Sequence, residues 1–259
     1  MSTADLEKAL KGLRLSGMAA TLESRALQVD SAEMNFVEGL SWLVQDELDR
    51  RHSRLLDRRF SSSGLTERKQ LRGLDWTYNP KLPRREILEL GTLKFIDRTE
   101  DVLLLGRPGT GKSHVAKALA LSAVDRGYKV VYREAHILLQ ELHEARQIGS
   151  LKKYRTPFMN AQLLVVDDLF LQKLPQGAGD ELADILMSRY EKASTIVTSN
   201  RPIEDWPALL GDVVVVAPLL DRLMHHGHLL KFDGKSWRMK EAAERNSGKI
   251  GEREELPLE

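Results

Sequence analysis

The segment VLLLGRPGTGKSHVAKALALSAV, residues 102–124, decides the fold of this 259-residue chain. Within it, GRPGTGKS at 106–113 matches the pattern G-x-x-x-x-G-K-[ST]. An apolar run typical of a buried strand precedes this loop, and a helical pattern follows it. Gly109 and Gly111 let the backbone curl so that successive N–H groups point at phosphate oxygens, and the helix N-terminus adds its positive dipole. The stretch therefore predicts a phosphate-binding loop between a strand and a helix.

The loop also predicts which residues contact a nucleoside triphosphate. Lys112 is expected to reach the β- and γ-phosphates, and Ser113 to ligate Mg²⁺. A chance Gly-Lys-Ser turn is the alternative, but it does not explain the strand and helix on either side. The expected nucleotide contacts are Gly106, Arg107, Pro108, Gly109, Thr110, Gly111, Lys112, Ser113 and His114.

A second apolar run, LLVVDDLF at 163–170, ends in two adjacent aspartates. A magnesium–triphosphate complex needs a carboxylate at the end of a neighbouring strand, and Asp167 is expected to hold the metal. Asp168 is expected to polarise the attacking water, although it could instead cap the turn that follows.

Other polar residues near strand or domain ends are weaker candidates. Asn200 ends the run STIVTSN and could bind the γ-phosphate or the lytic water, although Asn-Arg-Pro is also a good turn signal. Arg222 and Arg238 could stabilise charge on a transferring phosphoryl group, but isolated arginines are usually surface residues. The tract HHGH, residues 225–228, resembles a metal-binding tract, but no carboxylate close in sequence completes a site.

The rest of the chain predicts an α/β fold with a parallel five-stranded sheet covered on both faces. The expected strands are 102–106, 129–133, 161–168, 194–200 and 228–234, and helical patterns lie around 113–125, 135–146, 179–192 and 218–226. The four valines at 213–216 favour a strand by propensity yet precede a helical pattern, so the residues alone leave them unassigned.

The N-terminal part predicts a separate helical domain. Residues 4–28 and 33–59 have helical patterns, and SSSGL at 61–65 interrupts them. The expected organisation is a small all-helical domain at 1–64, a nucleotide-binding domain at 65–240 and a charged, disordered tail at 241–259. The absence of cysteine and of a visible signal sequence favours a reducing compartment, the cytoplasm.

Taken together, GRPGTGKSH, LLVVDDLF, STIVTSNRPIEDW and LLDRLMHHGHLLKFDGKSWR resemble the DnaC-like AAA+ ATPases in order and spacing. The segments LKGLRLSGMAATLES and NFVEGLSWLVQDELDRR are similar to the IstB-like helper ATPases of insertion-sequence transposition. The resemblance covers about Leu6 to Lys240. It implies that Asn200 is the sensor 1 residue, that Arg222 is an arginine finger for a neighbouring subunit, and that Arg238 is the sensor 2 arginine.

The resemblance also implies ATP and Mg²⁺ as ligands, ATP-dependent homo-oligomerisation, binding and remodelling of double-stranded DNA, and recruitment of a partner transposase. It makes residues 213–226 helical. AAA+ proteins commonly have Glu at the position of Asp168, which puts the rate of hydrolysis in question.

Basic residues give independent support for a nucleic-acid partner. Between residues 48 and 85 there are 11 Lys or Arg and 4 Asp or Glu. High densities of positive charge neutralise phosphates without reading bases, although a solvated helix face is an equal alternative. The candidate DNA contacts are Arg50, Arg51, Arg54 and Arg58 on one helix, and Lys152, Lys153 and Arg155 between the second and third strands.

Two other functions remain open from the residues. A DnaC-like helicase loader would prefer single-stranded DNA and engage a replicative helicase. A small-molecule P-loop kinase would be a monomer with an acceptor pocket, and the acidic pair, Asn200 and Arg222 fit it poorly.

Overall fold

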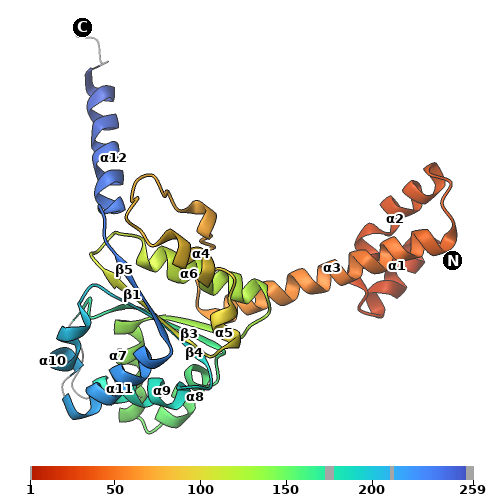
Figure 1. Cartoon of the computed structure of the whole chain (residues 1–259). Coiled ribbons are helices and arrows are strands. Elements are labelled where there is room, and N and C mark those ends of the chain that lie inside the picture. Colours follow the sequence, from red (N-terminus) through yellow and green to blue (C-terminus); the bar gives the residue numbers. More distant parts are fainter. Residues whose placement is uncertain (1, 173–177, 211–212, 255–259) are drawn as a thin grey trace. The chain divides into compact units, whose positions relative to one another are not determined.

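The computed structural model describes residues 2–172, 178–210 and 213–254, and they divide into two compact units. We call residues 1–59 the helical unit and residues 60–259 the larger unit (Figure 1). No helix in the described ranges is both long and apolar enough to cross a membrane.

The helical unit contains α1 (Thr3–Gly12), α2 (Ser16–Ser31) and most of α3 (Phe36–Ser63). The expected single helix over 4–28 is therefore wrong, because the chain breaks between Gly12 and Ser16 and Arg14 adopts a left-handed φ of 61°. At Gly17 an added Cβ would lie 2.6 Å from the Cα of Glu47, so α2 and α3 pack closely there. The buried Glu47 carboxylate accepts a hydrogen bond from the Gly17 amide and thereby fastens the contact.

The larger unit is built on the parallel five-stranded sheet that the sequence predicts. Its strands are β1 (Asp101–Gly106), β2 (Val130–Glu134), β3 (Leu163–Leu169), β4 (Ser194–Ser199) and β5 (Gly227–Phe232). All neighbours pair in parallel, and the order is β2-β3-β4-β1-β5. This order places β3 beside both β2 and β4, and β1 between β4 and β5.

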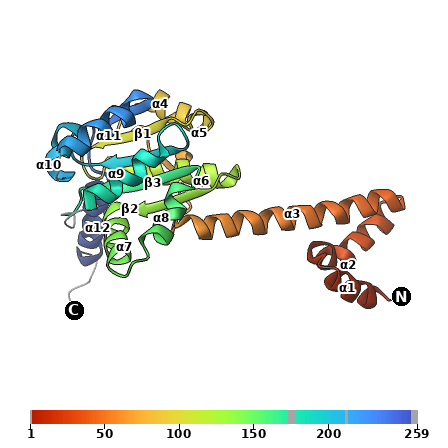
Figure 2. The same ribbon diagram turned by 90° about the horizontal axis from the view of Figure 1, so that it is seen from below.

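Helices cover both faces of the sheet (Figures 1 and 2). The sheet therefore divides the core into two layers. One face packs against α4 (Arg84–Leu90), α5 (Lys94–Asp97) and α6 (Lys112–Asp125). The other packs against α7 (Ala135–Gln147), α8 (Leu151–Met159), α9 (Ala178–Arg189), α10 (Trp206–Leu210) and α11 (Val213–His225). Successive residues of β1, Val102 and Leu103, belong to different layers, as the pleat of a strand requires. The unit also contains the short 3₁₀ turns η1 (Leu71–Gly73) and η2 (Ile203–Asp205).

The valine run at 213–216 forms the first turn of α11 and not a strand. Val216, Leu219, Leu220 and Leu223 are all buried, and their spacing places them on one face of the helix. Burial of this face against the sheet overrides the β propensity of valine.

The tail expected from residue 241 is described as far as residue 254, and residues 241–254 continue α12 (Trp237–Glu254). Residues 255–259 lie outside the described residues. Charges of opposite sign lie one helical turn apart at Lys240 and Glu244, 3.9 Å between charged atoms, and such pairs favour helix over coil.

Candidate functional site

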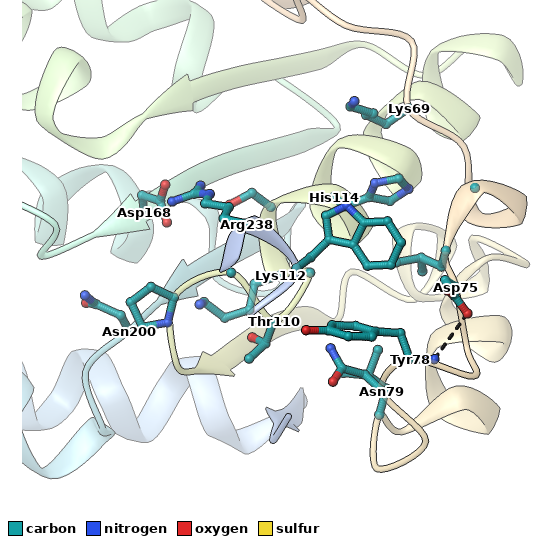
Figure 3. Close-up of a pocket in the computed structure, with 18 of the residues that line it drawn as sticks. Lys69, Asp75, Tyr78, Asn79, Thr110, Lys112, His114, Asp168, Asn200 and Arg238 are labelled. Atoms are coloured by element: carbon teal, nitrogen blue, oxygen red, sulfur yellow. Dashed lines mark hydrogen bonds between the residues drawn. The ribbon is translucent and has the colours of Figure 1, made fainter. Parts of the chain in front are cut away.

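A pocket of about 330 Å³ lies at the carboxyl ends of the strands, where the sequence predicts the phosphate loop (Figure 3). The loop forms its floor, and residues from well before and well after the loop form its walls. The lining residues are Lys69, Gly73, Leu74, Asp75, Tyr78, Asn79, Leu82, Pro108, Gly109, Thr110, Gly111, Lys112, Ser113, His114, Asp168, Leu171, Asn200, Trp237 and Arg238.

The loop holds its curled shape through left-handed glycines. Gly109 has φ +77° and Gly111 has φ +104°, conformations that other residues rarely adopt. A Cβ at Gly109 would lie 2.1 Å from Ser236 Oγ, and the Gly109 carbonyl accepts a 2.8 Å hydrogen bond from the Trp237 amide. Gly109 therefore both shapes the loop and joins it to the start of α12.

Lys112 begins α6 and is only 4% exposed. Its ammonium group donates hydrogen bonds to the carbonyls of Gly106, at 2.9 Å, and Arg107, at 3.0 Å. Burial lowers the pKa of Lys112, and the charges of Asp168 and Asp167 oppose that shift. These two hydrogen bonds hold the ammonium inside its own loop. They use two of its three N–H groups.

Asp167 lies below the pocket floor, 2% exposed, and is not among the lining residues. Its two carboxylate oxygens accept hydrogen bonds from hydroxyls on both neighbouring strands. Tyr132 on β2 donates to Oδ2 at 2.6 Å, and Thr198 on β4 donates to Oδ1. Burial, followed by the charge of Asp167, raises the pKa of Tyr132. Tyr132 therefore stays a neutral donor that fixes the orientation of the carboxylate.

Asp168 lines the pocket directly and has a left-handed φ of 54°. The regular pairing of β3 with β4 is interrupted between Val166 and Leu169, and the Asp168 amide donates to Thr198 Oγ1 at 2.8 Å. Burial raises the pKa of Asp168, and so does the neighbouring charge of Asp167. A raised pKa makes this carboxylate a stronger base toward water than an ordinary aspartate.

Asn200 and Arg238 reach the same polar end of the pocket as Asp168 (Figure 3). Asn200 Oδ1 is buried and has no hydrogen-bond partner within the described residues, which is uncommon for a buried polar atom. Arg222 does not line the pocket. Its guanidinium lies 5.4 Å from the ring centre of Tyr190 and donates to Met187 Sδ at 3.1 Å.

Aromatic side chains line the other end of the pocket, and no sequence pattern predicted them. Tyr78 and Trp237 pack edge to face with ring centres 5.2 Å apart. The side-chain amide of Asn79 makes two hydrogen bonds with the backbone of Lys235, at 3.0 and 2.8 Å. The Tyr78 hydroxyl donates to the Ser236 carbonyl at 3.1 Å. These residues lie more than 150 positions apart in the chain, so no local pattern could have paired them.

The arginine stripe of α3 makes internal contacts. Arg51 forms an ion pair of 2.6 Å with Glu47 and donates to the Arg14 carbonyl, and Arg54 donates to Ser16 Oγ at 3.1 Å. Both residues therefore hold the α1–α2 connection against α3 while staying exposed. The other two arginine candidates on α3, Arg50 and Arg58, are exposed.

The second basic candidate lies on α8. Lys152 and Lys153 are exposed, whereas Arg155 is partly buried and 3.5 Å from the carboxylate of Asp184. The structure thus brings the pocket residues together but does not test the predicted DNA contacts.

The parallel sheet, the glycine-rich loop and the acidic strand end define a P-loop protein of the AAA+ class. The fold agrees with solved structures that are only distantly similar in sequence. AMPPCP-bound DnaA from Aquifex aeolicus matches with a TM-score of 0.54 at 22% identity, over 76% of this chain and 58% of that one. DnaI matches with a TM-score of 0.55 at 19% identity, over 65% of this chain and 90% of that one.

Within this class the chain belongs to the IstB-like ATP binding protein family, whose model matches residues 8–245. The insertion sequence IS21 putative ATP-binding protein of Pseudomonas aeruginosa is 35% identical, over 92% of this chain and 89% of the relative. The insertion sequence IS5376 putative ATP-binding protein of Geobacillus stearothermophilus is 34% identical, over 88% and 91%.

Proposed function

We propose that this protein is an ATP-hydrolysing helper of insertion-sequence transposition that assembles on duplex DNA when it has bound ATP. The observation that carries the proposal is the convergence of Lys112, Asp168, Asn200 and Arg238 on one pocket above a phosphate loop. The curated relatives described above are named as ATP-binding proteins of insertion sequences, which supports the same function.

The two ends of the pocket give the nucleotide a direction. The phosphates lie at the polar end, over the loop amides and Lys112, because that end offers a helix N-terminus together with the cations Lys112 and Arg238. The base lies at the apolar end, against Tyr78 and Trp237, where a flat ring can pack on aromatic side chains. In this orientation the γ-phosphate faces Asp168 and Asn200.

The donor set fits a magnesium ion. Ser113 lines the pocket, and Asp167 holds an ordered carboxylate just below it, with both oxygens already bonded to hydroxyls. Carboxylate and hydroxyl oxygens suit Mg²⁺, which keeps several of its waters and uses few protein ligands. Bound Mg²⁺ would neutralise charge on the phosphate oxygens.

Asp168 and Asn200 act on the attacking water. Asp168, whose pKa is raised, accepts a proton or orients the water, and the unpartnered Oδ1 of Asn200 accepts a hydrogen bond from the same molecule. Arg238 stabilises negative charge at the polar end. Arg222 lies away from its own chain's pocket and serves as the arginine finger for a neighbouring chain, so the complete site requires an oligomer.

DNA binding depends on the exposed cations. Arg50 and Arg58 on α3 and Lys152 and Lys153 on α8 are the candidates to neutralise backbone phosphates, and Arg51, Arg54 and Arg155 divide their charge between internal contacts and DNA. Contacts of this kind give little base specificity and a strong dependence on salt. A transposase is the partner protein of the assembled form.

The test is ATP-dependent assembly on duplex DNA, measured by mass photometry with ATP, with ADP and without nucleotide. Lys112→Ala is expected to abolish assembly, and the wild-type complex is expected to dissociate steeply as salt increases. The exposed Lys129→Ala, outside the pocket, is the matched control and should assemble normally. Equal assembly by Lys112→Ala, or strong preference for single-stranded DNA, would contradict the proposal; the second result would instead favour a helicase loader.

A further inference from the structure

We propose that Glu191, His225 and His226 form a binding site for a divalent transition-metal ion. No carboxylate close in sequence completes a site with the HHGH tract, but the fold brings the carboxylate of Glu191 to it. Glu191, in the turn between α9 and β4, lies beside the last turn of α11. One ligand atom from each of the three side chains lies within 4.8 Å of the others.

The geometry is close to what a tetrahedral ion needs. His226 Nε2 lies 3.6 Å from Glu191 Oε1, and the two imidazole rings have centres 4.0 Å apart. Zinc bonds to nitrogen and oxygen of about 2.0–2.2 Å separate neighbouring ligand atoms by about 3.3 Å in a tetrahedron. All three side chains are exposed and can rotate through the remaining distance. The fourth position is open to water.

Surrounding groups already orient these side chains. The Tyr190 hydroxyl lies 3.1 Å from His225 Nδ1, and a partner of this kind on one ring nitrogen fixes the orientation of a ligating imidazole. Glu191 has a left-handed φ of 56°, which is uncommon for a residue other than glycine. His225 is the last residue of α11, and the carbonyl end of a helix favours a cation.

The donor types select the metal. Two imidazoles and one carboxylate suit Zn²⁺, Ni²⁺ or Cu²⁺, whereas Mg²⁺ and Ca²⁺ prefer oxygen ligands. This site is therefore distinct in chemistry from the magnesium site at the pocket. None of its three residues lines that pocket.

An ion bound here would also affect the surroundings of Arg222. The guanidinium of Arg222 lies over the ring of Tyr190, and the hydroxyl of the same ring contacts His225. Metal binding would thus join the α9–β4 turn to the end of α11, beside the ring that Arg222 contacts.

The test is calorimetric titration of the full chain with Zn²⁺ in excess Mg²⁺, which keeps oxygen sites occupied. Wild type is expected to bind one Zn²⁺, and His225→Ala and His226→Ala are each expected to weaken binding about tenfold or more. His52→Ala, an exposed histidine of the helical unit, is the control and should bind like wild type. Thermal unfolding without metal verifies that the variants fold.

Two results would overturn the proposal. One is the absence of Zn²⁺ binding below millimolar concentration. The other is binding of unchanged affinity in both histidine variants, which would place the ion elsewhere.

Discussion

Asp101→Asn is expected to change how the stability of the larger unit depends on pH. Asp101 begins the interior strand β1, at the end of the strand away from the phosphate loop, and is 9% exposed. Its Oδ1 accepts a 2.7 Å hydrogen bond from the Thr195 amide. Arg189, 1% exposed, provides the nearby positive charge, and its guanidinium is bonded to the Thr195 hydroxyl and to three backbone carbonyls.

The sign follows from the pKa of Asp101. Burial raises it from 3.8 to about 6, against the opposing effects of the Thr195 hydrogen bond and the Arg189 charge. The folded state therefore holds the proton more tightly than the unfolded state. The stability contributed by this group is fully present below pH 3.8 and is lost as the pH rises through 6.

The magnitude follows from the same shift. A difference of about two pKa units corresponds to about 3 kcal/mol in the free energy of unfolding, of which about 2 kcal/mol is lost between about pH 4.5 and 7.5. Asparagine retains an acceptor for the Thr195 amide but does not titrate. The stability of Asp101→Asn relative to wild type should thus rise by about 2 kcal/mol over that interval.

The assay is urea unfolding at a series of pH values, followed by tryptophan fluorescence because Trp206 is fully buried in the larger unit. Asp125→Asn, an exposed aspartate at the end of α6, is the control for changes in net charge. Parallel stability curves for wild type and Asp101→Asn would contradict this prediction, as would a fall in the stability of Asp101→Asn relative to wild type as the pH rises.

Three further substitutions test the site. Tyr132→Phe removes a hydroxyl donor of Asp167 and should raise the Mg²⁺ concentration for half-maximal binding of a fluorescent ATP analogue about tenfold; an unchanged requirement would exclude this positioning role. Gly109→Ala places a Cβ 2.1 Å from the Ser236 hydroxyl oxygen at a left-handed φ, so the melting temperature and the ATP affinity should both fall. Wild-type values of both quantities would contradict the loop geometry. Arg222→Ala should keep ATP affinity but lose most turnover, and mixing it with a phosphate-loop variant should restore part; no recovery at any ratio would argue against a shared site.

Local patterns predicted the strands and the loop well. The five strands, the helix after the loop and the parallel sheet each depend on a short apolar run with its flanking turn signals, and such runs are visible in the sequence. The break between α1 and α2 was missed because Arg14 takes a conformation that its residue type does not suggest. The helical valines of α11 were ambiguous until burial of one face was known.

The site was predicted only in part, because several of its contacts join residues that lie far apart in the sequence. Tyr132 meets Asp167 only because β2 and β3 pair in parallel, with Glu134 opposite Asp167. The exposure of Asp168 to the pocket depends on a backbone distortion in β3. Likewise Glu191 meets the histidines of α11 because α9 and α11 pack side by side in one layer of the core.

Equilibrium dialysis of the full chain against labelled ATP, in the presence of Mg²⁺, measures whether the pocket binds the nucleotide. One ATP is expected to bind per wild-type chain, and Lys112→Ala is expected to lose binding. A folded wild-type chain that takes up no ATP, or a Lys112→Ala chain that binds it equally well, would show that the phosphate loop does not bind ATP as proposed.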